Sequence, residues 1–308
     1  MCRVVLSQKV NSITFNWRMV IVVKVLLLLI VLVNGLFAFR FFKDFIKHKK
    51  EAWAEPGNNI LLAVWGAVCF FFSTFGISDF ALSTVLYRTR KLVDDAKLPG
   101  TLNTQCAIPV AVMALAYISS INVDQMTLVL LIVSQMIGAY FGPRFVVKMP
   151  VRHIRMFMGV GLVLAAFFVV AGKFGLLPSG GEATGLTGGK LALGMVLLLV
   201  YGALNNVGVG SYAPTMATVY ALGLNPAIAF PVMMGACTFS VPVGGMEFVR
   251  LGQYARKITL FSSIFGILGV LAAVFIVKSL DTGMLQWVVA AVILIAGIDL
   301  LRAAFTKK

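Results

Sequence analysis

The chain has 308 residues, of which 60% are hydrophobic and 12% are charged, and its mean hydropathy is +0.98. A soluble domain of this length cannot bury so many apolar side chains, so the composition excludes a soluble globular protein and predicts one that crosses a membrane several times. The net charge of +15 comes from Lys and Arg residues in short segments between apolar runs. This distribution is typical of cytoplasmic loops in membrane proteins and not of a nucleic-acid-binding surface.

The expected fold is all-α, because only helices or closed barrels satisfy the backbone in lipid and the alternating pattern of barrel strands is absent. The cysteines and histidines show no CxxC spacing and no Cys–His spacing that would hold zinc. We therefore expect no disulfide framework, no metal site and no cofactor. These residues are Cys2, Cys69, Cys106, Cys237, His48 and His153.

The first apolar run, 19–39, is expected to span the membrane, and the basic segment after it, 40–50, is expected to be a cytoplasmic loop. A cleaved signal peptide is the alternative, but no A-x-A site follows the apolar run. An uncleaved span with its N-terminus outside is favoured, although Arg3, Lys9 and Arg18 argue against exporting that end.

The later loops alternate in charge. Basic residues mark 88–97, 144–155, 250–257 and the C-terminus as inside, whereas 119–125, the Gly-rich linker 176–187 and 279–283 lack such clusters and are expected outside. Full spans are then expected at 101–119, 126–143, 156–174, 227–249, 258–277 and 284–301.

Two apolar runs are interrupted by glycines: 59–75 is followed by 79–88, and 190–206 is followed by 211–222. The arms after the interruptions have about 10 to 12 residues, or roughly 15 to 18 Å at 1.5 Å per residue, which is half of a membrane span. Each pair of arms must start and end on the same side of the membrane to keep the loop assignments above. We expect helical hairpins that turn inside the membrane.

The chain also repeats itself. "GISDFA" at 76 aligns with "GVGSYA" at 208, Pro99 with Pro231, and "FVVK" at 145 with "FIVK" at 275. The organisation expected is an N-terminal span with a basic loop (1–56), a first repeat (57–175), a Gly-rich linker (176–187) and a second repeat (188–308). Each repeat holds a hairpin and three spans, so the two copies lie inverted. Inverted repeats with broken helices are the construction of secondary transporters.

The stretch "NNVGVGSYAPTMATVYALGLNPAIAFPVMMGA", 205–236, resembles the sulfite exporter TauE/SafE family, whose two halves each carry a Gly-rich break followed by an apolar helix with a proline. The likeness extends over both repeats but not over the first span. It implies transport of small anions, commonly sulfur-containing ones such as sulfite, sulfoacetate or other sulfonates, usually as export across the bacterial inner membrane. The first half departs from the pattern, because Ser78 and Asp79 stand where the family has glycines.

The second break has the chemistry of an anion site. Its glycines let the backbone approach a ligand, and the N–H groups that open the next helix carry a partial positive charge. The alternative is that these glycines only permit close helix packing. The expected substrate-binding residues here are Asn205, Asn206, Gly208, Gly210, Ser211 and Tyr212.

The first break contributes Gly76, Ser78 and Asp79 to the expected substrate site. A carboxylate near the middle of a membrane is costly and usually faces an interior pathway. Three interpretations of Asp79 stay open: the N-cap of the following helix, a proton-accepting residue that couples transport, or a ligand for a cation.

Polar side chains also occur in the first full span of the first repeat. Asn103 and Gln105 need partners in hydrocarbon, so they either bond neighbouring helices or line the substrate path.

Two further pairs are expected to be structural. Cys106 and Cys237 fall one position apart in the repeat alignment, and packing is favoured over a functional role. Glu247 and Arg250 are one helical turn apart and are expected to form a structural ion pair.

The sequence therefore predicts a secondary transporter, an exporter of a small sulfur-containing anion that works by alternating access where the two broken helices meet. Its partners are the anion and the bilayer, with no nucleic acid; coupling to protons or to another cation and the oligomeric state stay open. The alternatives are a membrane-embedded enzyme or sulfur-relay protein and a passive anion channel. Against an enzyme, the chain has no H-E-x-x-H or G-x-S-x-G motif.

Overall fold

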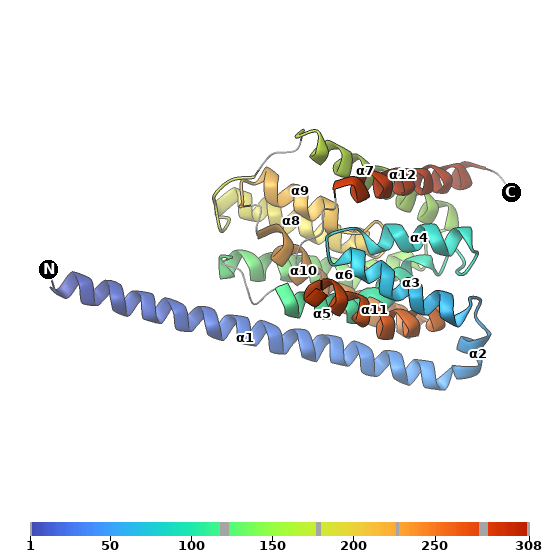
Figure 1. Ribbon diagram of the computed structural model, residues 1–308, viewed down its shortest axis with the longest axis horizontal. Coiled ribbons are helices and arrows are strands. Elements are labelled where there is room, and N and C mark those ends of the chain that lie inside the picture. Colours follow the sequence, from blue (N-terminus) through green and yellow to red (C-terminus); the bar gives the residue numbers. More distant parts are fainter. Residues whose placement is uncertain (1, 118–122, 177–179, 226–227, 277–282, 307–308) are drawn as a thin grey trace.

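The computed structural model in Figure 1 describes residues 2–117, 123–176, 180–225, 228–276 and 283–306. The regular structure of these residues is helical, in agreement with the predicted all-α fold. The helices are α1 (Cys2–Lys47), α2 (Lys49–Ala54), α3 (Asn59–Ser73), α4 (Asp79–Thr89), α5 (Leu98–Tyr117), α6 (Gln125–Val146), α7 (Val151–Lys173), α8 (Gly188–Asn205), α9 (Tyr212–Ala221), α10 (Ala229–Leu251), α11 (Arg256–Ile276) and α12 (Gly283–Phe305).

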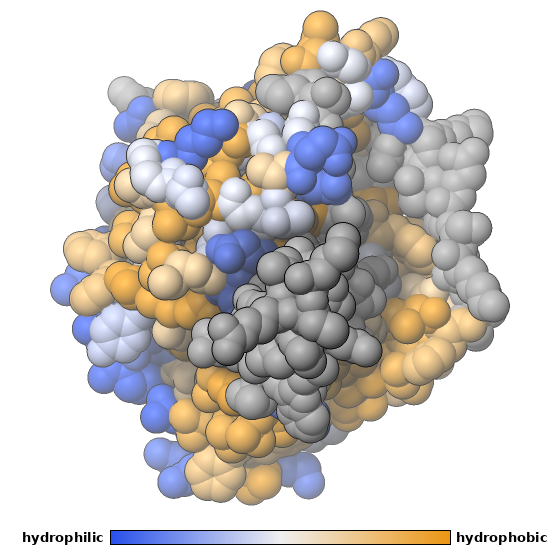
Figure 2. All heavy atoms as spheres, turned by 90° about the vertical axis from the view of Figure 1, so that its left-hand side faces the viewer, coloured by the Kyte–Doolittle hydropathy of each residue, from blue (hydrophilic) through white to orange (hydrophobic). Residues whose placement is uncertain are grey.

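The molecule is a polytopic membrane protein. Within the described residues, seven helices are long and apolar enough to cross a membrane, and α3 is a shorter apolar helix. Large apolar side chains are exposed on many of these helices, as expected for surfaces that face lipid. In the end-on view of Figure 2, hydrophobic side chains cover much of the flanks, and hydrophilic ones gather on the end that faces the viewer.

The segments predicted to lie inside come together at one end of the bundle. Arg155 of α7 donates from Nε to Asp95, in the α4–α5 loop, at 2.7 Å and from Nη1 to the carbonyl oxygen of Ala303 in α12 at 3.1 Å. The predicted ion pair between Glu247 and Arg250 is present at this end.

The segments predicted to lie outside meet at the opposite end. The backbone N–H of Asp124 donates to Thr184 in the linker at 2.9 Å, and that of Asn225 donates to Ala183 at 2.8 Å. Of the predicted outside loops, 119–125 lies partly and 279–283 almost wholly outside the described residues.

The first helix differs from the prediction. The segment 40–50 was expected to be a loop, but α1 continues through it to Lys47. Phe37, Phe41 and Phe45 recur every four residues and are buried, so this stretch is amphipathic: its apolar face packs on the bundle while its basic residues lie on the other faces. Asn34, on the same buried side, donates to the carbonyl oxygen of Thr238 in α10 at 3.0 Å.

The other predicted spans are present as α5, α6, α7, α10, α11 and α12, and the two interrupted runs as α3 with α4 and α8 with α9. Helices α5 and α10 form the centre: 83% of the most apolar part of each is buried, against 22 to 56% for the other five helices that are long and apolar enough to cross a membrane. The packing on either side of this centre is paired. Helix α3 packs on α11 as α8 packs on α6, and α12 contacts α4 as α7 contacts α9.

Glycines bring the backbones together in these paired contacts. A Cβ atom added to Gly138 of α6 would lie 1.9 Å from the carbonyl oxygen of Leu199 in α8. A Cβ atom added to Gly269 of α11 would lie 2.0 Å from the carbonyl oxygen of Ala67 in α3. The first arm of each broken helix is therefore held by direct backbone contact with a helix from the other half of the chain.

Candidate functional site

The first arms, α3 and α8, end in the same backbone turn. In each, the N–H of a glycine donates to the carbonyl oxygen three residues earlier, and the next N–H donates to the carbonyl oxygen five residues earlier. The glycines are Gly76, with φ of 84°, and Gly208, with φ of 97°. This is the Schellman motif, which needs a left-handed residue that glycine adopts at little cost. The predicted breaks at 76 and 208 are thus explained by helix termination.

The second arms begin differently. Ser78 is the N-cap of α4, with its Oγ atom accepting from the N–H of Ala81 at 3.3 Å, and Asp79 is the first helical residue. The N-cap interpretation of Asp79 is therefore wrong, because the serine before it takes that role. Ser211 precedes α9, but its hydroxyl is hydrogen-bonded to the Cys237 thiol of α10 at 3.2 Å and does not cap the helix.

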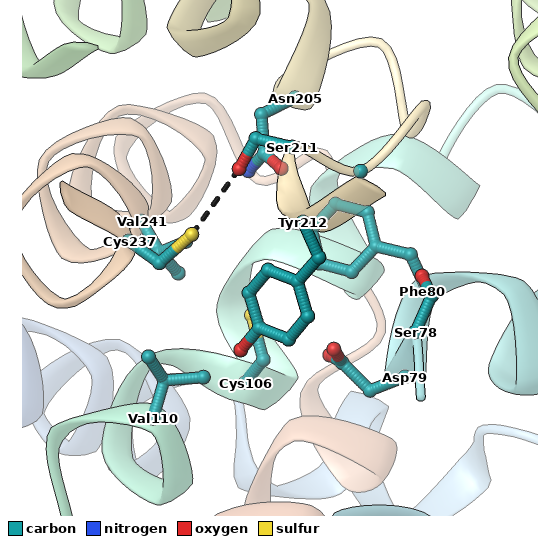
Figure 3. A pocket seen from close by; sticks show the side chains of 11 residues that line it. Ser78, Asp79, Phe80, Cys106, Val110, Asn205, Ser211, Tyr212, Cys237 and Val241 are labelled. Atoms are coloured by element: carbon teal, nitrogen blue, oxygen red, sulfur yellow. Dashed lines mark hydrogen bonds between the residues drawn. The ribbon is translucent and has the colours of Figure 1, made fainter. Parts of the chain in front are cut away.

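The two breaks meet at one buried cavity, which we call the central cavity. A Cβ atom added to Gly210 would lie 3.4 Å from Oγ of Ser78, so the second break lies against the first. Figure 3 shows side chains from α4, α5, α9 and α10 converging on it. The cavity has a volume of about 10 Å³ and is lined by Ser78, Asp79, Phe80, Cys106, Val110, Asn205, Gly210, Ser211, Tyr212, Cys237 and Val241.

Asp79 is the only acidic or basic side chain in the lining just given, and it is 3% exposed. Its Oδ1 atom accepts from the hydroxyl of Ser73 at 3.2 Å. Its Oδ2 atom has no hydrogen-bond partner of ordinary geometry in the described part of the chain. Within the described residues, it interacts with the thiols of Cys69, Cys106 and Cys237 and the phenols of Tyr87 and Tyr212, and no Lys, Arg or His side chain lines its cavity.

A buried carboxylate with an unpartnered oxygen and no cation is costly. Such a carboxylate occurs in a folded protein when it is protonated or when the function of the protein requires it.

The two asparagines nearest the centre bond each other across the two halves. Asn205 donates from Nδ2 to Oδ1 of Asn103 at 3.1 Å, and Asn103 donates from Nδ2 to the carbonyl oxygen of Asn205 at the same distance. Asn205 also lines the central cavity, whereas Asn103 does not. The reciprocal pair fixes the orientation of the Asn205 amide beside the cavity.

Several predicted binding residues do not reach the cavity. Gln105 bonds Tyr87 and Ser83, and Asn206 donates to the carbonyl oxygens of Ala139 and Gly202, so both amides connect neighbouring helices. Gly76 and Gly208 end their helices, and Asn103 holds the amide of Asn205. The predicted residues that the structure brings together around the cavity are Ser78, Asp79, Asn205, Gly210, Ser211 and Tyr212.

Sequence reasoning missed some of the lining. Cys106 and Cys237 were assigned to packing, yet both line the cavity. Gln135 of α6, which was not considered, does not line the cavity but supports it: its Nε2 atom donates to Ser211 at 3.3 Å and to Ser240 at 3.1 Å, and its Oε1 atom has no partner among the described residues. A buried amide in the middle of an apolar span was the available signal.

Broken helices that meet at a buried polar cavity inside a membrane bundle define this protein as a membrane transporter. The chain belongs to the sulfite exporter TauE/SafE family, whose family model matches residues 10–169, slightly more than half of its length.

The matched residues confirm the family that the sequence motifs indicated, but their extent differs from the expected likeness. They include the first span, which was left out, and end before 205–236. Members of the family transport sulfite or related anions. No curated protein and no solved structure matches the chain significantly.

Proposed function

We propose that the protein is a secondary transporter that exports a small sulfur-containing anion, such as sulfite or an organosulfonate, across the cell inner membrane. The observation that carries this proposal is the contact between the two breaks, Gly210 against Ser78, at a cavity lined by both halves of the chain. Family membership supports the class of substrate. No catalytic step is part of the proposed function.

The start of α9 is suited to hold the anion. The first N–H groups of a helix lack partners within the helix and carry a partial positive charge, which favours a negative ligand. Ser211 and Asn205 place a hydroxyl and an amide at the same cavity. Gly210 keeps the approach to these groups free of a side chain.

The small size of the cavity supports alternating access. About 10 Å³ has room for roughly one water molecule, so a sulfur oxyanion enters only when the surrounding helices move apart. We infer that the two halves, 57–175 and 188–308, are inverted repeats. In that architecture the same rearrangement opens the cavity to one side and, in mirror fashion, to the other.

The inverted arrangement is tested by accessibility. Single cysteines at position 96 and at position 225, in a background without the four native cysteines, are expected to react with an impermeant maleimide from opposite faces of the membrane. Reaction of both from the same face would refute the inverted repeats.

Asp79 is the proposed coupling residue. An anion at the start of α9 and a charged Asp79 would share one small cavity without a cation between them, and like charges repel strongly at low effective dielectric. The anion and a proton on Asp79 therefore bind and move together, so export is favoured when the anion is more concentrated inside the cell.

Counterflow in proteoliposomes tests the transport proposal, because only a carrier exchanges labelled for unlabelled sulfite against a gradient. Gly210→Leu should abolish counterflow, since the side chain fills the cavity. Gly175→Leu is the matched control: Gly175 has φ of 66°, close to the 77° of Gly210, and nothing lies within 4 Å of an added Cβ. Both variants carry the same backbone strain of roughly 1 to 2 kcal/mol. Counterflow by Gly210→Leu at the rate of the control would refute the site.

A further inference from the structure

A second and much larger cavity opens beside the central one. This lateral cavity has a volume of about 260 Å³ and lies between α7, α8 and the start of α9. Its walls are mostly apolar, with Leu164, Ala165 and Phe168 from α7 and Leu204 and Val209 from the end of α8 and the break. Leu164 is 50% exposed, so the cavity opens towards the flank of the bundle.

The two cavities share a wall. Ser78, Gly210 and Tyr212 line both, so the two cavities are adjacent, and Gly210 adds no side chain to the wall between them. The hydroxyl of Tyr201, a polar group of the lateral cavity, is already hydrogen-bonded to Thr218 at 3.0 Å. A ligand that occupied both cavities would meet polar groups at the central end and apolar surface at the lateral end.

We propose that the substrate is an organic anion with an apolar body, such as an alkyl- or arylsulfonate, whose charged group lies at the start of α9 and whose body fills the lateral cavity. The inference rests on the proposed function and narrows its substrate class. Sulfite would use only the central cavity and would leave the apolar walls without a partner, whereas a body of several carbon atoms buries them and gains affinity with each methylene.

A small organic anion can occupy both cavities at once, whereas a membrane lipid can reach only the lateral one. Residues 161–168 lie in the middle of α7, several residues from each end of that span, and the helix breaks lie at the same level. The charged group of a phospholipid stays at the membrane surface, so it cannot reach the breaks while its chain occupies the lateral cavity. A small anion can place its charge there.

Binding of a chain-length series tests the inference. The ligands are ³⁵S-labelled sulfite and the 1-alkanesulfonates from methane- to hexanesulfonate, measured on purified protein in lipid nanodiscs with empty nanodiscs subtracted. The wild-type dissociation constant is expected to fall about fourfold for each added methylene. Labelled 1-hexanol, which has the chain without the charge, should bind far more weakly than hexanesulfonate.

Filling the lateral cavity should remove this gradient. Ala165→Phe places a ring in the cavity, and Leu164→Trp does so from a half-exposed position that tolerates a larger side chain. Both variants should bind methanesulfonate like the wild type and lose most of the gain with chain length. Ala272→Phe, at a half-buried position of α11 outside both cavities, is the matched control and should keep the gradient.

The outcomes separate the two proposals. Affinity that is independent of chain length in the wild type, with sulfite and methanesulfonate still bound, would overturn the apolar-body inference and leave the proposed function intact. An affinity that still rises with chain length in both filled variants would also overturn the inference. So would binding of hexanol as tight as that of hexanesulfonate, which would identify the lateral cavity as a site for lipid chains. Absence of binding by every ligand would refute the proposed function itself.

Discussion

Replacement of Asp79 by asparagine isolates the charge of the central cavity. The amide has the shape of the carboxylate and keeps an oxygen that can accept from Ser73. The cap of α4 is Ser78, so the substitution leaves helix initiation unchanged. Because the native carboxylate is buried and no cation lines its cavity among the described residues, we expect the variant to fold and to be at least as stable as the wild type.

The size of the effect can be calculated from Coulomb's law for two charges in one small cavity. Two negative charges about 5 Å apart at an effective dielectric constant of about 20 repel by about 3 kcal/mol. Converted to affinity, this repulsion weakens anion binding on the order of a hundredfold when Asp79 is ionised. The protonated wild type and the Asn variant should bind the anion equally well.

The sign of the pH dependence is fixed by linkage. Since the anion binds better to the protonated form, wild-type affinity should fall as the pH rises, by about tenfold per unit while Asp79 loses its proton, and then level off. Asp79→Asn should show no such fall. Methanesulfonate is the appropriate ligand because it does not change its own charge over the assay range.

Transport provides the second readout. In proteoliposomes, Asp79→Asn should exchange labelled for unlabelled anion when the pH is equal on both sides, but should not accumulate the anion in response to a pH gradient. Accumulation driven by the pH gradient at the wild-type rate, or a wild-type affinity that does not change with pH, would refute the coupling role of Asp79.

Two further substitutions test how the fold is held. Gly138→Ala should lower the stability by about 1 to 3 kcal/mol, because its Cβ atom would lie 1.9 Å from the carbonyl oxygen of Leu199. Gly189→Ala is the control and should be neutral, since nothing lies within 4 Å of its Cβ atom. Equal melting temperatures of the two variants in detergent would contradict the backbone contact. Glu55→Ala should lower the stability by about 1 to 2 kcal/mol, since the Glu55 carboxylate accepts from the first two N–H groups of α11 at 3.0 and 2.8 Å. Glu51 has a side chain that is 70% exposed, so Glu51→Ala should change the stability by less than about 0.5 kcal/mol. An equal loss in both variants would argue against the helix cap.

The fold was largely predictable because the residues at the helix breaks determine where the helices end. Gly76 and Gly208 end their helices through a backbone turn that other residues adopt only with strain, so a glycine in an apolar run marks the break. The continuation of α1 to Lys47 was missed because five basic residues outweighed the phenylalanines between them. Whether Phe41 and Phe45 find a surface to bury depends on α10 and the bundle, which no local pattern reveals.

The site was predictable only where it lies next to a break. Ser78, Gly210, Ser211 and Tyr212 follow directly from the helix ends that they adjoin. Cys106 and Cys237 come from α5 and α10, and which of their faces points at the cavity is set by how the two helices rotate against each other.

The amides show the same limit. Gln105 turns to Tyr87 and Ser83, whereas Gln135 turns to Ser211. Both are buried glutamines in apolar spans, and only packing distinguishes them.

The backbone contacts of the first arms divide the molecule mechanically. Gly269 and Gly138 press α3 and α8 against helices of the opposite half, so these arms cannot slide without parting two backbones. The second arms have fewer such constraints: α4 reaches across to α12 and α9 to α7. We therefore expect bending at Gly76 and Gly208, where each tightly packed first arm ends, and the second arms to move with Asp79 and Ser211 at their starts. Both second arms pack against the α7–α12 pair, so we expect a movement of that pair to act on both breaks at once.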